Sequence, residues 1–232
     1  MALTPQNDEA FLREVDDELR REQMTGLWKR YGRIGIGLVG LLLATFAGVL
    51  FWQNQQAKKA DAQGEAMSAA IADIQAGRKT DAETKLTRIA TDNSDGLRAS
   101  ALFAKAALSA DRGDRKGAAA IYGSIATDTK LPQPYRDLAL IRQTVTEYDM
   151  LKPAVVIERL KPLAVPGQPW FGAAGELTAV AWLDQHQPAQ AAQMLAAVAR
   201  DGQAPTSIRG RAKRLAAALG ANVDNIAIAQ KD

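Results

Sequence analysis

Three glycines near the N-terminus have a spacing that can bind phosphate. In the stretch GIGLVG, Gly35, Gly37 and Gly40 fit the pattern G-x-G-x-x-G, whose glycines let the backbone approach the pyrophosphate of a dinucleotide. That chemistry requires a strand before the glycines and an acidic residue on a second strand about 20 positions later. Here WKRYGR precedes the motif, and Asp61 lies in the polar, helix-like stretch AKKADAQGEAM. We therefore predict no nucleotide site.

Residue types that perform catalysis or hold metals are scarce. The chain has one histidine, His186, and no cysteine, whereas acid–base and nucleophilic catalysis use positioned His, Cys or paired carboxylates. Zinc sites need three or four such ligands. His186 precedes Pro188 in a predicted turn, which favours a solvated side chain. We expect no enzymatic activity, no catalytic residue, no metal ion and no cofactor.

The glycines instead belong to a long apolar run. Residues 34–52, IGIGLVGLLLATFAGVLFW, contain no charge over 19 positions, and about 20 apolar residues span the hydrocarbon core of a bilayer. Trp28 and Tyr31 flank one end and Phe51 and Trp52 the other, as expected of interfacial aromatic anchors. A cleaved signal peptide has a shorter apolar region and a nearby small-residue cleavage site, which QNQQAKK does not offer. The run predicts one uncleaved transmembrane helix.

The basic residues around this run predict its orientation. Residues 14–33 contain five Lys and Arg and residues 53–72 contain two, and the side richer in these residues stays in the cytoplasm. The five that set the predicted topology are Arg20, Arg21, Lys29, Arg30 and Arg33. We expect a cytoplasmic tail with an amphipathic helix at 1–33, the transmembrane helix at 34–52, an exported domain at 53–219 and a C-terminal tail at 220–232.

Three small residues within the run recur every four positions. Gly40, Ala44 and Gly48 fall on one stripe of a helix, and such stripes let two membrane helices approach closely. The stripe therefore predicts contact with a partner helix or a second copy. The alternative is that glycine is simply frequent in membrane helices.

The domain after the run contains a recurring helical signature. Four segments read small-x-x-x-large-x-x-aliphatic-Ala, and their first residues lie 36, 38 and 35 positions apart. Offsets of four, seven and eight share one helix face. The predicted packing residues are Ala82, Leu86, Ala118, Tyr122, Val156, Leu160, Ala191 and Leu195. With the turns at Gly77, Gly113 and His186, the period resembles the tetratricopeptide repeat, and we predict four helical hairpins followed by a capping helix.

These repeats are degenerate. No unit has the aromatic residues that the tetratricopeptide consensus places in the first helix of each hairpin. Pro162 predicts that the second helix of the third hairpin ends or kinks there. Between the third and fourth units lies VPGQPWFG, in which Trp170 and Phe171 are either packed or displayed. The fold class expected is all-α, with a single N-terminal transmembrane helix followed by a degenerate tetratricopeptide-repeat-like solenoid.

The whole chain resembles a known membrane family. A tail reading FLREVDDELRREQMTGLWKRYG, one span and degenerate repeats are similar to the YfgM-like ancillary subunits of the SecYEG translocon, which share their repeat domain with the cell-division coordinator CpoB. The resemblance implies a single-pass protein of the bacterial inner membrane with its repeat domain in the periplasm. It also implies association with the SecYEG-type translocon and with periplasmic chaperones.

The remaining features are ambiguous from sequence. The tail stripe of Phe11, Val15 and Leu19 predicts either a docking helix or a helix lying on the membrane surface. A basic cluster in SIRGRAKRL is explained by a solvated helix face, and residues 222–232 are expected to be weakly ordered. The exported part carries 23 Lys and Arg against 19 Asp and Glu, which gives little reason to expect nucleic acid as a partner.

Two functions are consistent with these features. The first is an ancillary, translocon-associated scaffold that links SecYEG to periplasmic chaperones. The second is a membrane-anchored scaffold for cell-envelope or division complexes that is unrelated to secretion. Stacked helical repeats create an extended recognition surface in both cases, so the repeats do not separate them.

Overall fold

The structure is a computed structural model that describes residues 6–91 and 95–226. Within the first helix it describes the side chains of residue 34, residues 36–38 and residues 40 onward. The described ranges form nine α helices and one 3-10 helix and contain no strand, which confirms the all-α fold class. The chain divides into two compact units, Met1–Ala62 and Gln63–Asp232.

Residues 6–62 of the first unit lie within one long helix, α1 (Gln6–Gln75). No proline occurs between Pro5 and Pro132, so nothing removes a backbone donor along α1. The apolar run lies inside this helix, and its described side chains from Ile34 to Trp52 are exposed. Among the residues that the structure describes, this helix is the one long and apolar enough to cross a membrane.

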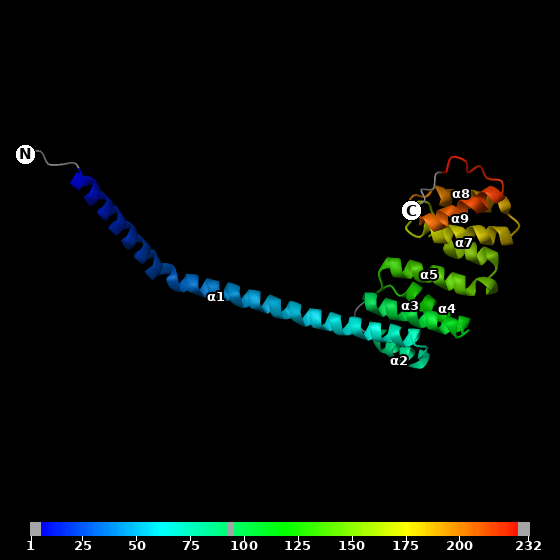
Figure 1. The fold of residues 1–232 in the computed structure, drawn as a ribbon, viewed down its shortest axis with the longest axis horizontal. Helices are drawn as coiled ribbons and strands as arrows, with labels where there is room; N and C mark the ends of the chain where they lie inside the picture. The colour runs from blue at the N-terminus through cyan, green and yellow to red at the C-terminus, as the bar shows by residue number, and fades with distance from the viewer. Residues whose placement is uncertain (1–5, 92–94, 227–232) are drawn as a thin grey trace, which may run out of the picture. The chain divides into compact units, whose positions relative to one another are not determined.

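The second unit is a series of antiparallel helical hairpins, stacked one after another in Figure 1. We call the two helices of each hairpin helix A and helix B. The last turns of α1 and α2 (Lys79–Ile89) form the first hairpin, and α3 (Asp95–Asp111) and α4 (Arg115–Thr127) the second. The third has α5 (Gln133–Glu147), η1 (Tyr148–Met150) and α6 (Pro153–Leu160). The fourth has α7 (Phe171–Asp184) and α8 (Pro188–Arg200), and α9 (Thr206–Ala218) follows.

A pair of buried residues recurs at the same spacing in each hairpin, with one residue from each helix. Helix B contributes the first residue of the recurring signature, and helix A contributes a residue twelve positions earlier in the chain. The four pairs are Ala70 and Ala82, Ala106 and Ala118, Thr144 and Val156, and Ala179 and Ala191, each residue no more than 1% exposed. The hydroxyl of Thr144 donates to the carbonyl of Leu140 at 2.7 Å, so its burial leaves no unsatisfied donor.

Three of the turns between helix A and helix B have the same hydrogen bonds. Gly77, Gly113 and His186 adopt positive φ, and the amide of the next residue donates to the carbonyl five positions earlier at 2.8–3.0 Å. This is the Schellman ending of a helix, in which glycine is preferred because it has no Cβ. His186 adopts φ 56° without that advantage.

We expect His186→Gly to stabilise the repeat unit by about 1 kcal/mol, because it relieves a left-handed conformation that costs other residues roughly 1–3 kcal/mol. Gly113→Ala should have the opposite sign and similar size, because it adds a Cβ where φ is +81°. Urea unfolding followed by circular dichroism at 222 nm measures both. Destabilisation by His186→Gly would show that its side chain makes a compensating contact.

The third hairpin departs from the other three. Helix α6 ends at Leu160, which agrees with the predicted effect of Pro162, and a loop continues to α7. Phe171 is fully buried, and Trp170 packs against the cluster that contains Val156. Both aromatic residues are therefore packed rather than displayed.

Helix α9 begins a fifth unit, and no helix B follows it within the residues that the structure describes. Gly220 has φ +83° and the same turn hydrogen bonds as the other units. Lys213 stands where the complete units have the small residue of helix A, and its Nζ donates to the carbonyl of Ile226 at 2.6 Å. Val223 and Ile226 are buried against α8 and α9. The expectation of weak order is wrong for residues 222–226, because these two aliphatic side chains complete the terminal core.

Candidate protein-interaction surface

The apolar run of α1 presents its small-residue stripe without obstruction. Gly40, Ala44 and Gly48 are exposed, and a Cβ added at either glycine would meet no atom within 4 Å. Phe51 and Trp52 are exposed at the end of the run. The side chains of the other predicted anchors, Trp28 and Tyr31, lie outside the described residues, as do those of Arg20, Arg21, Lys29, Arg30 and Arg33.

All eight predicted repeat-packing residues lie inside the second unit. The four at the start of the signature form the helix A–helix B pairs described above. The four larger ones fill the space beside those pairs, and none exceeds 7% exposure: Leu86, Tyr122, Leu160 and Leu195. Phe103 of α3 and Tyr122 of α4 add an aromatic contact, with ring centroids 5.9 Å apart. These residues are buried, so they are not available to a ligand.

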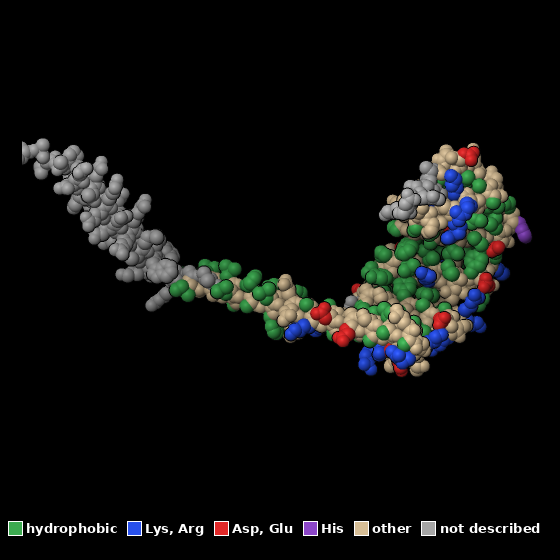
Figure 2. Space-filling view, in the orientation of Figure 1, with side chains coloured by type: hydrophobic (Ala, Val, Ile, Leu, Met, Phe, Trp, Pro, Cys, Tyr) green, Lys and Arg blue, Asp and Glu red, His purple; other side chains and the backbone are tan. Residues whose placement is uncertain are grey.

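The helix A surface carries a second repeated set, which we call the ladder. It consists of the residue eleven positions before the start of each helix B signature, namely Ile71, Ala107, Val145 and Val180. All four are exposed, and the three larger side chains keep 44%, 48% and 36% of their surface accessible. Figure 2 shows hydrophobic side chains gathered over the middle of this unit. Sequence reasoning missed the ladder, although its spacings of 36, 38 and 35 residues match those of the packing signature.

Ion pairs join successive hairpins at the edge of the helix A surface. Lys79, near the start of α2, lies 2.5 Å from Asp111 at the end of α3. Arg115, at the start of α4, lies 2.9 Å from Asp149 of the next unit. Lys79 lowers the pKa of Asp111 by hydrogen bonding. Because the side chains of both pairs are exposed, each pair contributes little to stability.

A different contact replaces this ion pair between the third and fourth hairpins. Pro153 stands where the earlier units have Lys79 and Arg115, so no cation is available there. Instead the hydroxyl of Tyr148 donates to Asp184 at 2.7 Å. Burial and the neighbouring Asp184 carboxylate raise the pKa of Tyr148, so this hydroxyl keeps its proton at neutral pH.

Within the first hairpin, a buried carboxylate joins the helices. Asp73 of α1 accepts from Lys85 of α2 at 2.6 Å and from Arg78 at 2.5 Å. The equivalent positions of the third hairpin hold Glu147 and Arg159, which lie 2.5 Å apart. Hydrogen bonds from Lys85 and then Arg78 lower the pKa of Asp73, outweighing the opposing effect of burial.

The lowered pKa of Asp73 predicts an acid-sensitive first hairpin. Because the unfolded chain binds this proton more readily, the stabilisation is present above the unfolded pKa of about 3.9. It is lost as the pH falls through the lower, folded-state value. We expect Asp73→Asn to have a lower melting temperature than the parent protein at pH 5. Between pH 5 and pH 3, the melting temperature of the variant should fall less than that of the parent. Thermal unfolding measures both proteins. Equal falls in melting temperature would contradict a stabilising role for the ionised Asp73.

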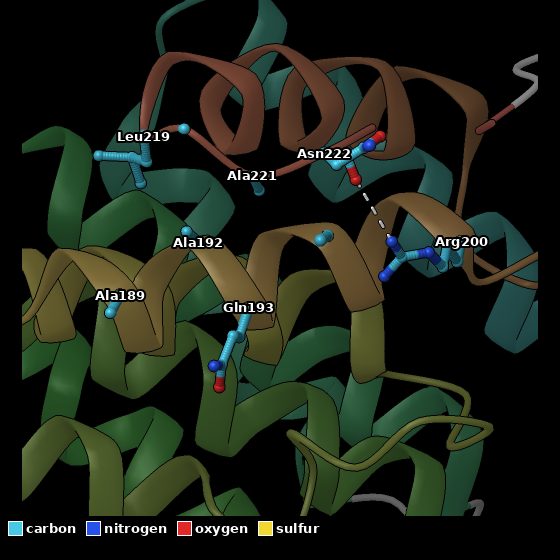
Figure 3. A pocket seen from close by; sticks show the side chains of 9 residues that line it. Ala189, Ala192, Gln193, Arg200, Leu219, Ala221 and Asn222 are labelled. Atoms are coloured by element: carbon cyan, nitrogen blue, oxygen red, sulfur yellow. Dashed lines mark hydrogen bonds between the residues drawn. The ribbon is translucent and has the colours of Figure 1, made fainter. Parts of the chain in front are cut away.

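Groups that could bind a metal are scarce among the described residues. No group of three or more His, Cys, Asp and Glu that could hold a metal is found among them, and His186 is exposed in its turn. A pocket of about 470 Å³ lies between α8 and residues 219–222 (Figure 3). The pocket is lined by Ala189, Ala192 and Gln193 of α8 and by Leu219 and Ala221. Ala192 lies toward Ala221, and Arg200 donates to the carbonyl of Asn222 at 3.5 Å. This lining offers surface but no reactive group.

Comparison with known families agrees with this geometry. The model of the tetratricopeptide repeat-like domain matches residues 26–176. The chain belongs to the tetratricopeptide repeat-like family. No curated protein and no solved structure matches it. The family match ends within α7, yet the turn at His186 and the pair Ala179–Ala191 continue the same register through the fourth hairpin. Tetratricopeptide repeat-like domains are typically non-catalytic and mediate interactions between proteins.

Proposed function

We propose that this protein is an ancillary subunit of a SecYEG-type translocon and that it links the translocon to periplasmic chaperones. The observation that carries the proposal is the combination of one helix able to span a membrane with a tetratricopeptide repeat-like interaction domain. The resemblance of the tail, span and repeats to YfgM-like subunits supports the choice of partners. In this role the chain performs no chemistry and uses no cofactor.

The proposed location is the bacterial inner membrane. Residues 1–33 lie in the cytoplasm, residues 34–52 cross the bilayer and residues 53–219 lie in the periplasm. The bias of five against two flanking Lys and Arg supports this orientation, and Trp28, Tyr31, Phe51 and Trp52 are placed to anchor the helix at the two interfaces. Protease added to spheroplasts should digest the repeat domain and spare the tail. Protection of the repeat domain would reverse the assigned topology.

The two parts of the chain have different tasks in this proposal. The stripe of Gly40, Ala44 and Gly48 docks the span against a membrane-protein helix, where close packing drives association. The helix A surface of the second unit, with its exposed aliphatic ladder, binds the periplasmic partner. Exposed apolar rows on an otherwise satisfied scaffold are typical of protein-binding sites.

A second candidate is a scaffold for cell-envelope or division complexes, favoured by the resemblance of the repeat domain to CpoB. Purification of the full chain from mild-detergent extracts, with partners quantified by mass spectrometry, separates the two. We expect SecY-type subunits and periplasmic chaperones to be enriched together over a mock purification. Enrichment of division proteins without translocon subunits would favour the second candidate.

A further inference from the structure

The ladder has no role in folding that explains its residue types. Ile71, Val145 and Val180 contribute little buried area because more than a third of each side chain is exposed. Branched aliphatic residues are also poorer helix formers than Glu, Gln, Lys or Arg. These branched residues recur at one register in three of the four helices A, with Ala107 at that position in α3. This recurrence indicates a surface for contact with another molecule.

The charges beside the ladder are unequally compensated. Asp111 and Asp149 are held by Lys79 and Arg115, and Glu176 of α7 is paired with Arg211 of α9. By contrast, Arg142 of α5 and Arg214 of α9 are exposed and form no ion pair with any residue that the structure describes. The surface therefore offers free positive charge, while most of its carboxylates are already paired.

The position of Arg214 makes the two ends of the ladder chemically different. Arg214 lies 34 residues after Val180, the same interval that separates the turn residues His186 and Gly220. It therefore occupies the ladder position of α9, so the row is aliphatic over four hairpins and cationic at its end. In Figure 2, Lys and Arg side chains lie over α8 and α9, beyond the hydrophobic middle of the unit.

We propose that the ladder binds an aliphatic segment of a partner protein that carries acidic side chains at the α9 end. This inference rests on the proposed scaffold function and names the chemistry of its periplasmic partner. Aliphatic side chains of the segment cover Ile71, Val145 and Val180, and the carboxylates at its α9 end meet Arg214. Complementary charge at one end sets the orientation of the segment and disfavours basic sequences.

Three rhodamine-labelled peptides test this chemistry against the full chain in nanodiscs, with affinity measured by fluorescence anisotropy. The first has an aliphatic segment followed by an acidic end, SLASLVSALSDED. The second replaces DED with KRK, and the third keeps DED but replaces each Leu, Val and Ala with Ser or Gly. We expect the first peptide to bind at least tenfold more tightly than either of the others.

Two pairs of variants assign the binding to the ladder. Val145→Gln with Val180→Gln should weaken binding of the first peptide at least tenfold. The control, Val155→Gln with Val165→Gln, alters valines that are 42% and 44% exposed outside the ladder and should leave binding unchanged. Arg214→Glu should remove the preference for the acidic over the basic end, whereas Arg88→Glu, an exposed arginine of α2, should keep it. Circular dichroism checks that each variant is folded.

Failure of the first peptide to bind would overturn the inference, as would equal affinity for all three or equal losses in the ladder and control variants. The translocon assignment is judged separately, since enrichment of SecY-type subunits depends on the span. Enrichment without peptide discrimination would leave the proposed function standing and remove this inference. Peptide discrimination without enrichment of SecY-type subunits would support this inference and contradict the translocon assignment.

Discussion

Ala118→Trp is expected to destabilise the repeat unit by about 3 kcal/mol, the upper part of the usual range for overpacking. Ala118 is fully buried and belongs to the same core cluster as Ala106, which is also fully buried. An indole ring at that crossing separates α3 from α4, because the interior has no void to accept it. For a domain of this size, the melting temperature should fall by roughly 6–12 °C.

The matched control is Ala120→Trp, two residues further along α4, where the alanine is exposed. It adds the same side chain to the same helix without crowding the crossing, so we expect a change within about 0.5 kcal/mol. Thermal unfolding of the full chain in micelles, followed at 222 nm, measures both variants. Equal melting temperatures for parent and Ala118→Trp would show that α3 and α4 do not cross closely at this residue.

The second large effect is expected in the membrane. Replacing Gly40, Ala44 and Gly48 together with Ile should reduce co-purification of the partner membrane protein at least tenfold. Insertion should persist because the run becomes more apolar, but the branched side chains hold the partner helix away and remove close packing. Quantitative mass spectrometry of the purified complex measures the loss.

A control on the opposite face makes the result specific. Leu42, Phe46 and Leu50 lie on the other side of the same helix and are exposed. Replacing these three with Ile should leave co-purification near the parent level. If the small-residue variant also keeps its partner, the stripe has no docking role and the repeat domain carries the association.

The sequence predicts the scaffold well because its packing depends on a local rule. Ala118 and Tyr122 lie on one face of one helix, so their spacing alone predicts burial. Pro162 likewise predicts the end of α6, since proline removes a backbone donor and clashes with the preceding turn. The span follows from length and hydropathy, without knowledge of its neighbours.

The interaction surface is harder to predict because it depends on how the hairpins stack. Val145 and Val180 resemble ordinary core residues in sequence, and their exposure becomes clear only when the register of helix A is known. Arg115 and Asp149 lie 34 positions apart in the sequence. The residues around either one therefore give no indication of the ion pair. The composition of residues 222–232 predicts weak order, yet Ile226 is buried against the last helices of the unit.

The most direct test of the proposed translocon association is site-specific photo-cross-linking from the span. A photoreactive phenylalanine analogue is placed at position 44, on the small-residue stripe, and separately at position 46 on the opposite face. After irradiation of intact cells, the cross-linked products of the full chain are identified by mass spectrometry. We expect SecY-type neighbours from position 44 and few or none from position 46. Cross-links to unrelated membrane proteins alone, or the same products from both faces, would contradict it.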